Sequence, residues 1–135
     1  MIVLPERMVI TSNLQEARRV ERKVLEQVQR LGYGETARFG IRLALEEAIN
    51  NAIKHGNEGD PAKGVEISFS VTEQQVEITV ADQGDGFDPD SIADPTTEEN
   101  LQKPSGRGIM LMRAYVDEVR YSSKGNAVTL IKRKR

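Results

Sequence analysis

The apolar residues near the start of the chain recur at helical spacing. Between residues 14 and 31 they are Leu14, Ala17, Val20, Val24, Leu25, Val28 and Leu31. Recurrence every three or four residues is typical of an amphipathic helix. Capping residues at 11–13 precede this segment, and Glu16 stands where it could close a capping box. The pattern predicts a short strand over residues 8–10 and then a helix over residues 14–31, ended by the glycines within 32–34.

A second helical pattern covers residues 36–54 and carries polar side chains among its apolar ones. The apolar positions are Ile41, Leu45, Ala48, Ile49, Ala52 and Ile53. Glu47 and Asn51 are four residues apart, so a helix places them on one face, and His55 extends the row. An Asn in mid-helix costs about half a kcal/mol relative to Ala. The row is therefore either a solvated face or a binding surface, and Gly56 is expected to cap the helix.

The second half of the chain changes to a period of two. Residues 65–71 and 76–80 alternate apolar and polar side chains, which predicts a β-hairpin. Residues 116–121 and 127–131 predict a second hairpin, and a short helix is expected over 109–115 between the two. Helices thus come first, and strands with one inserted helix follow. This order predicts an α+β two-layer sandwich with helices packed on one face of a mostly antiparallel sheet.

Length and composition narrow the class of protein. The 135 residues suffice for one domain with a real core, so we expect a single domain over residues 1–135. A net charge of −2 gives no reason to expect direct contact with nucleic acid or with a membrane. The chain shows neither an apolar run of the ~20 residues that span a membrane nor a signal-peptide pattern, so a cytoplasmic location is expected.

The scarcity of two residue types excludes several chemistries. There is no cysteine, which excludes a disulfide scaffold, a cysteine nucleophile and a thiolate metal site. His55 is the single histidine, so a histidine-rich zinc centre is excluded. A serine triad would have to use it, and the sequence contains no Gly-x-Ser-x-Gly elbow to pair with it.

Two glycine-rich motifs flank a long aperiodic stretch, residues 83–105. The first runs from Asp82 through Gly84 to Gly86 at the end of a predicted strand. An aspartate there can accept a hydrogen bond from an exocyclic amine, and glycines let a ligand approach the backbone. The second is the triplet 106–108, Gly-Arg-Gly, whose amides and arginine before a helix suit phosphates.

Each motif alone is a weak signal, but their order is informative. A polar helix face, an Asp-Gly turn, an aperiodic stretch and a glycine-rich helix start together supply what a nucleotide needs. Asn51 offers an oxygen to Mg²⁺, which prefers oxygen ligands and keeps several waters, and Glu47 offers a carboxylate for proton transfer. Neither a Walker motif nor a Rossmann fingerprint occurs, so those nucleotide folds are excluded.

These motifs resemble the three nucleotide-binding boxes of the GHKL ATPase/kinase superfamily, which has the Bergerat fold. The first box is the Glu-Ala-Ile-Asn-Asn-Ala-Ile-Lys-His-Gly run over residues 47–56, the second is Asp-x-Gly-x-Gly over 82–86, and the third is Gly-Arg-Gly over 106–108. The short chain and the form of the first box are most similar to the anti-sigma-factor serine/threonine kinases of bacterial stress and sporulation switches. The resemblance covers the chain from its first helix to its last hairpin.

The resemblance implies a role for each box residue, with ATP and Mg²⁺ as cofactors. Glu47 would be the general base that takes the proton of a substrate serine or threonine, Asn51 would ligate Mg²⁺, and His55 belongs to the same box. Asp82 would bind the adenine amine, with the pocket shaped by Gly84 and Gly86. The phosphates would be held by Gly106, Arg107 and Gly108. One departure is Asn126 after Gly125, where relatives often have a threonine that helps to bind adenine.

The resemblance also implies partners. It predicts a kinase that phosphorylates a STAS-type anti-anti-sigma protein and sequesters a sigma factor, with a homodimer as the expected assembly. The lack of periodicity and the many proline, glycine and acidic residues of the long loop predict in addition that residues 88–104 form a lid. The alternative is a binding module that senses ATP or ADP and holds a regulator without phosphorylating it, although Glu47 favours the kinase because binding alone needs no base.

Overall fold

The computed structural model describes residues 5–84 and 106–134, and for residues 106 and 107 it describes the backbone only. The elements follow in the order β1 (Glu6–Thr11), α1 (Leu14–Arg30), α2 (Glu35–Asn51), η1 (Ala52–Gly56), β2 (Gly64–Val71), β3 (Gln75–Ala81), α3 (Gly106–Tyr115), β4 (Glu118–Tyr121) and β5 (Ala127–Arg133). The predicted lid, residues 88–104, lies outside the described residues. None of the described helices is long and apolar enough to cross a membrane.

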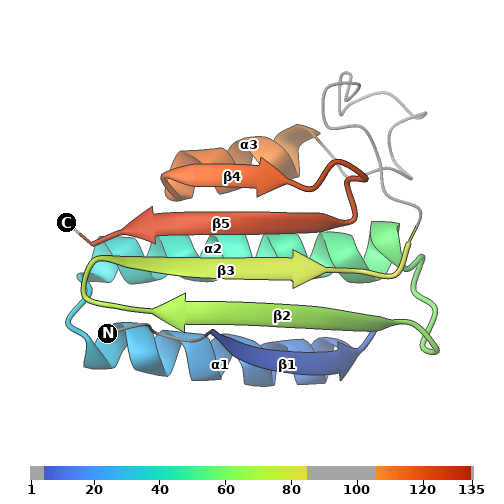
Figure 1. Cartoon of the computed structure of the whole chain (residues 1–135), viewed down its shortest axis with the longest axis horizontal. Coiled ribbons are helices and arrows are strands. Elements are labelled where there is room, and N and C mark those ends of the chain that lie inside the picture. The colour runs from blue at the N-terminus through green and yellow to red at the C-terminus, as the bar shows by residue number, and fades with distance from the viewer. Residues whose placement is uncertain (1–4, 85–105, 135) are drawn as a thin grey trace.

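The five strands form one sheet with the order β1-β2-β3-β5-β4. Each of its four strand pairs is antiparallel. All three α-helices lie on the same face of this sheet, with α1 behind β1 and β2, α2 behind the centre, and α3 near β4 (Figure 1). The predicted α+β two-layer sandwich is therefore confirmed, and the hairpins β2–β3 and β4–β5 form where the alternating patterns predicted them.

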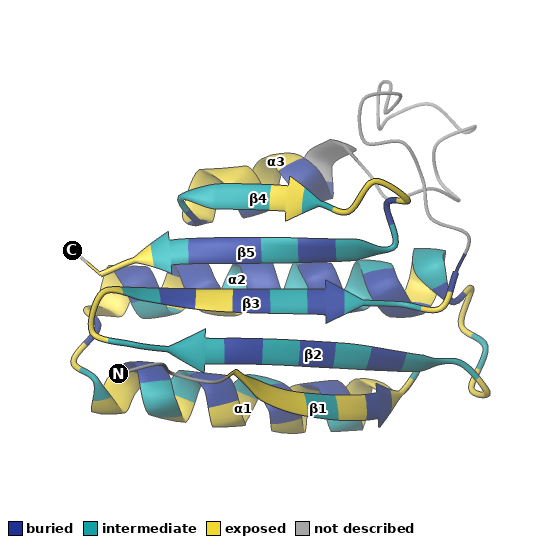
Figure 2. Cartoon of the chain, viewed as in Figure 1, coloured by how far each residue is buried: buried dark blue, intermediate teal, exposed yellow. Residues whose placement is uncertain are grey.

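The core lies between the sheet and the helices. Alternate residues of each inner strand are buried, as the banding of β2 and β3 in Figure 2 shows. Cross-strand pairing aligns Ile67, Val80, Val128 and Tyr121 in one row across four strands. Because directly paired residues share a face of the sheet, the row faces the helices and packs against the core cluster. Tyr121, in β4, is the member of this row nearest to α3.

The first helix begins at Leu14, as predicted. Asn13 is its N-cap, and its Oδ1 accepts a hydrogen bond from the Gln15 N–H at 2.7 Å. Glu16 does reach back, but it accepts from the backbone N–H of Thr11 at 3.0 Å and from the Thr11 hydroxyl instead of from the cap residue itself. The capping-box residue thus also fixes the end of strand β1.

The end of the second helix differs from the prediction. The α-helical part stops at Asn51, and the chain widens into a π-helical turn, η1, in which the Asn57 N–H bonds the carbonyl of Ala52 at 2.8 Å. Gly56 does not cap the helix in a left-handed conformation; positive φ occurs later, at Glu58 and Gly59. The reason for a glycine at position 56 is steric and appears in the site described below. Such π-turns occur often at functional sites.

The third helix begins earlier than predicted, at Gly106 and not at Ile109. The Gly-Arg-Gly triplet therefore forms the first turn of α3 and does not precede it. The first amides of a helix have no partner within it, so this placement still leaves N–H groups at the helix start.

Candidate functional site

The residues predicted from the three motifs gather at one end of the sheet. The end of α2 with η1, the end of β3 and the beginning of α3 all lie there, at the right of Figure 1. The grouping brings together segments that are far apart in the sequence. Gly86 and the rest of residues 85–105 lie outside the described part, so the role of Gly86 stays a prediction.

Asp82 directly follows β3, and both its backbone and its side chain are bonded. Its N–H donates to the carbonyl of Asn126 at 2.9 Å, and its Oδ1 accepts from the Gly84 N–H at 2.7 Å. Burial raises the pKa of this half-buried carboxyl, opposed by the Gly84 hydrogen bond and by the charges of Lys124 and Lys63. A donor from a ligand would favour the ionised form further. Asp82 is thus a fixed acceptor at the edge of the site.

Two glycines let the chain close around this aspartate. A Cβ on Gly56 would lie 2.2 Å from Cγ of Asp82, and one on Gly84 would lie 1.9 Å from the carbonyl oxygen of Gly56. Carbon atoms do not approach that closely, so neither position has room for a side chain. The end of the π-turn is therefore in direct backbone contact with the turn after β3, which the sequence motif alone did not reveal.

Glu47 lies against the first turn of α3. A Cβ on Gly108 would lie 2.2 Å from Oε1 of Glu47, so the carboxylate occupies the space that this glycine leaves open. Tyr121 is near as well: burial raises the pKa of its phenol to about 12, with the charge of Glu47 adding to the shift and that of Arg113 opposing it. The structure thus brings Glu47, the predicted base, to the helix start that the sequence assigned to phosphates.

Asn51 is one turn further along α2 from Glu47 and has an incomplete set of hydrogen bonds. Its side-chain nitrogen is buried and has no hydrogen-bond partner among the described residues. Buried amides normally form hydrogen bonds, and a buried polar group without a partner lowers the folding stability by about 1–3 kcal/mol. The amide can also turn over, which exchanges its nitrogen and oxygen. The site therefore fits a ligand that completes this amide, such as a phosphate group with its Mg²⁺.

The remaining predicted site residues of the helices are His55, Gly106 and Arg107. His55 lies half-buried within η1, close to the contact between Gly56 and Asp82. Gly106 and Arg107 form the first turn of α3. The side chain of Arg107 is not described, so its contact with phosphates stays a prediction. No group of three His, Asp or Glu side chains within residues 5–84 and 106–134 is placed to hold a metal ion.

Sequence reasoning missed Asn57 as part of the site's framework. This side chain is fully buried, and its Nδ2 donates to the Gly64 carbonyl at 3.0 Å and to Oγ of Ser12 at 3.2 Å. Its Oδ1 accepts the backbone N–H of Gln83 at 2.8 Å. One amide therefore ties the end of η1 to β2 and to the turn after β3. A single Asn after a helix carries no sequence signal that distinguishes this role from an ordinary loop residue.

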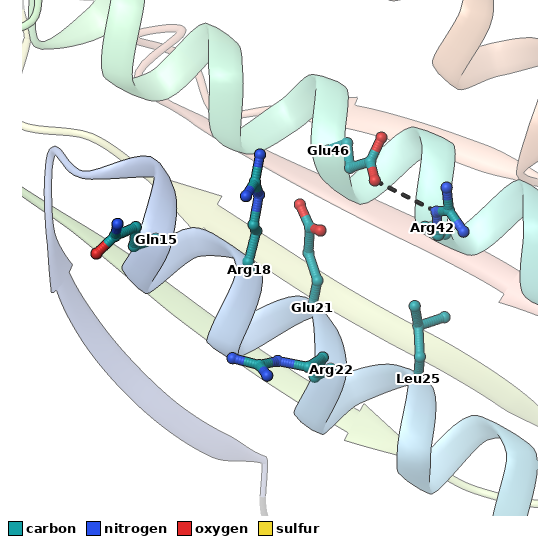
Figure 3. A pocket seen from close by; sticks show the side chains of 7 residues that line it. All are labelled: Gln15, Arg18, Glu21, Arg22, Leu25, Arg42 and Glu46. Carbon is teal, nitrogen blue, oxygen red and sulfur yellow. Dashed lines mark hydrogen bonds and ion pairs between the residues drawn. The ribbon is translucent and has the colours of Figure 1, made fainter.

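A separate groove lies between α1 and α2, on the helix side facing away from the sheet. Its volume is about 670 Å³, and Figure 3 shows its lining side chains: Gln15, Arg18, Glu21, Arg22, Leu25, Arg42 and Glu46. Within it Glu46 accepts a hydrogen bond from Nε of Arg42 at 3.3 Å. Glu46 and Glu47 are adjacent in sequence, but Glu46 lines this groove while Glu47 contacts α3. The groove is therefore distinct from the site that the motifs form.

We expect the charge of Glu21 in this groove to make stability depend on pH. Burial raises its pKa from 4.5 to about 7, and the Glu46 charge adds to the shift against the opposing Arg42 and Arg18. The folded state therefore binds the proton more tightly, so the stabilisation is full below pH 4.5 and is lost as the pH rises through about 7. Glu21→Gln should raise the melting temperature at pH 8 by about 2–5 °C, after allowance for solvent screening, and much less at pH 5.

Thermal unfolding at the two pH values measures this effect. Glu26→Gln is the matched control, because Glu26 lies on the same helix in an exposed ion pair with Arg30. An equal change at both pH values in the Glu21 variant would contradict the assigned titration.

Comparisons with known proteins show which sequences and structures the chain resembles. The profile of the histidine kinase-like ATPase domain family matches residues 10–132. The anti-sigma F factor of Bacillus cytotoxicus is 38% identical over 94 residues, which cover 67% of this chain and 64% of that protein. The serine-protein kinase RsbW of Bacillus subtilis is 34% identical over 97 residues, covering 67% of this chain and 61% of that protein. The chain thus spans less than two thirds of the length of these two relatives.

A third relative and two solved structures extend the likeness. The anti-sigma F factor of Clostridium perfringens (strain SM101 / Type A) is 35% identical over 99 residues, 70% of each chain. A structure of RsbU and RsbW domains from Mycobacterium tuberculosis superposes on 98% of this chain and 32% of its own, with a TM-score of 0.66 and 20% identity. The catalytic domain of the histidine kinase ThkA superposes on 93% of this chain and 94% of its own, with a TM-score of 0.52 and 15% identity. The two structures support the fold.

Proposed function

The chain belongs to the family of histidine kinase-like ATPase domains, and from this premise we propose that it is a MgATP-dependent protein serine/threonine kinase that acts as an anti-sigma regulatory factor. The names of its relatives, serine-protein kinase RsbW and anti-sigma F factor, support both halves of the proposal. The observation that carries it is the arrangement on α2: the buried side-chain nitrogen of Asn51 has no hydrogen-bond partner among the described residues, and it lies one turn from a carboxylate that touches the start of α3. Nucleotide binding alone would need the Asn51 amide, but it would not need a carboxylate at position 47.

The adenine end of the proposed site is the turn after β3. Asp82 would accept the exocyclic amine, because its Oδ1 is already fixed by Gly84 and its backbone by Asn126. The close contact of Gly56 and Gly84 holds the turn after β3 against the end of η1, and this keeps Asp82 at the adenine end of the proposed site. The start of α3 would receive the phosphates, because the amides of a helix N-terminus and its dipole favour anions. Arg107 would add a charge there.

The transfer end of the proposed site is the Glu47–Asn51 row. Bound MgATP would supply the phosphoryl group and the charge neutralisation that such transfers depend on. Asn51 would hold the cation through its amide oxygen and would orient it over the helix face. Glu47 would accept the proton of the attacking serine or threonine hydroxyl, a task that suits a carboxylate held beside the phosphate-binding turn. His55 would line the same face.

The proposed partners are those that the resemblance to the anti-sigma-factor kinases implies. The protein substrate would be a STAS-type anti-anti-sigma protein, and the second partner would be a sigma factor. A homodimer and a cytoplasmic location are part of the same proposal.

The test is incubation with labelled ATP, Mg²⁺ and candidate STAS proteins from the same genome. Transfer of label to a serine or threonine supports the kinase, whereas partner binding without any transfer would identify a nucleotide-sensing binding module.

The metal ligand can be tested by nucleotide binding alone. Asn51→Ala removes the amide proposed to hold Mg²⁺, so Mg²⁺ should no longer tighten ATP binding, and we expect the affinity to fall by about tenfold or more. Calorimetry with Mg²⁺ and with EDTA measures the ATP affinity and its dependence on Mg²⁺. Asn50→Ala is the matched control, because Asn50 is its sequence neighbour and a helix places it on a different face. A variant that still responds to Mg²⁺ would remove Asn51 from the proposed metal site.

A further inference from the structure

Asn126 holds the backbone of Asp82 at two points. Asn126 immediately precedes β5, beside the pair formed by Ala81 and Ala127 that closes the β3–β5 ladder. Its carbonyl accepts the Asp82 N–H at 2.9 Å, and its side-chain Nδ2 donates to the Asp82 carbonyl at 3.3 Å. The two bonds fix the peptide groups on both sides of the Asp82 Cα, and so fix the direction in which its carboxylate leaves the chain.

The amide of Asn126 is itself oriented by the turn between β4 and β5. Its Oδ1 accepts from the Ser122 hydroxyl at 3.2 Å, and Oγ of Ser122 accepts from the Ala127 N–H at 3.2 Å. Gly125 makes this tight turn possible at φ 79°. Both ends of the Asn126 amide therefore bond within the protein. Relatives often have a threonine at position 126, whereas the Asn126 side chain of this protein forms a hydrogen bond with the backbone of Asp82.

The turn is held from the other side by Asn57, so the carboxylate has little freedom. Asn57 accepts the Gln83 N–H at 2.8 Å, and Oε1 of Gln83 in turn accepts the Gly64 N–H at 3.1 Å. A fixed acceptor discriminates between ligands more sharply than a mobile one, because a ligand lacking the matching donor leaves the acceptor unmet. A mobile carboxylate could turn back to water.

We propose that Asn126 is a positioning residue that holds Asp82 in place and thereby sets the preference of the site for bases that carry an exocyclic amine. The inference rests on the proposed function, because Asp82 is the group assigned to adenine there. Asn126 acts through Asp82 and makes no contact of its own with the base. The effect is therefore on selectivity, and it depends on the carboxylate being present.

The experiment compares ATP with inosine triphosphate, in which a carbonyl replaces the exocyclic amine. Affinities for both are measured by calorimetry with Mg²⁺ in the unaltered protein, Asn126→Ala, Asp82→Asn and the double variant. The Ala variant keeps the backbone carbonyl that binds the Asp82 N–H and loses only the side-chain contacts. We expect its ATP preference to fall about fivefold, the worth of one ordinary hydrogen bond. In the Asp82→Asn background the same change should have no further effect.

Two further variants serve as controls. Ser123→Ala changes an exposed residue of the same turn and should leave the preference unaltered. Asn126→Asp keeps the size of the side chain and replaces its Nδ2 donor by an acceptor, so it should lower the preference at least as far, and it serves where the Ala variant fails to fold. Thermal unfolding is recorded for every variant.

Three outcomes would overturn the inference. A lowered melting temperature with unaltered preference would make Asn126 merely structural, and an equal loss of preference in the Asp82→Asn background would mean that Asn126 touches the base itself. Equal affinity of the unaltered protein for ATP and inosine triphosphate would show that the site has no preference for Asn126 to set. Failure of the unaltered protein to bind ATP at all is a different result, which overturns the proposed function together with the inference.

Discussion

Replacing Glu47 with Gln should leave ATP binding close to that of the unaltered protein and slow phosphorylation of the proposed STAS-type substrate by about 10²–10⁴-fold, the usual contribution of a general base. Glutamine keeps the shape of the side chain and can still form hydrogen bonds, but it does not accept a proton at neutral pH. The carboxylate lies against Gly108 in the first turn of α3, so its place beside the proposed phosphate site is fixed by packing. Single-turnover transfer from labelled ATP measures the rate, and calorimetry measures the binding.

The neighbouring residue provides the matched control. Glu46 lines the groove on the other side of α2, in an ion pair with Arg42 of which both side chains are more than a third exposed. Such pairs contribute little, so Glu46→Gln should change neither ATP binding nor transfer appreciably. Equal losses in the two variants would mean that the charge of the helix, and not the position of one carboxylate, supports transfer. An unchanged rate in Glu47→Gln would remove Glu47 as the base.

Gly84→Ala should weaken ATP binding by about tenfold or more and lower the unfolding free energy by about 1–3 kcal/mol, the usual range for an added methyl group in a filled space. Its Cβ would lie 1.9 Å from the carbonyl oxygen of Gly56, a backbone atom. Relief requires that the π-turn or the turn after β3 move, and either movement displaces Asp82. Calorimetry with MgATP and thermal unfolding measure the two effects.

Gly34→Ala is the control for this substitution. Gly34 is the N-cap of α2 at φ −68°, and nothing lies within 4 Å of the position its Cβ would occupy. Alanine is a poorer N-cap than glycine, so a loss of about 0.5–1 kcal/mol is expected, with ATP binding unaltered. If Gly84→Ala bound ATP as well as the control did, the contact between the two backbones would not be needed for the site.

The period of the apolar residues was enough to predict most of the fold. It located α1 to within one residue at its end, both hairpins, and the placement of all helices on one face of an antiparallel sheet. These predictions succeed because each helix or strand buries one face. Apolar residues therefore recur about every 3.6 positions in a helix and every 2 positions in a strand. The row of Glu47 and Asn51 was predictable for the same reason, since a spacing of four within one helix is a local property.

The boundaries of the helices at the site were less predictable. The sequence predicted an α-helix through residue 54 with a glycine cap, whereas the structure has a π-turn from Ala52 to Gly56. Local preference alone gives no reason for that wider turn. It forms where the end of the helix meets Gly84 and where Asn57 bonds three other segments. Tertiary contacts therefore set the end of this helix.

From the sequence alone, most elements could be predicted, and so could the residues that we propose to carry the chemistry: Glu47 and Asn51 on one helix face, Asp82 at a strand end, and the glycines that follow. Three features became visible only in the folded chain: Gly56 meets Asp82, Gly108 meets Glu47, and Asn57 and Asn126 hold the turn after β3. The physical reason is the range of the forces involved. Periodicity and capping act within a few residues, whereas these contacts join segments 26 to 61 positions apart, and they exist only once the sheet has brought the segments together.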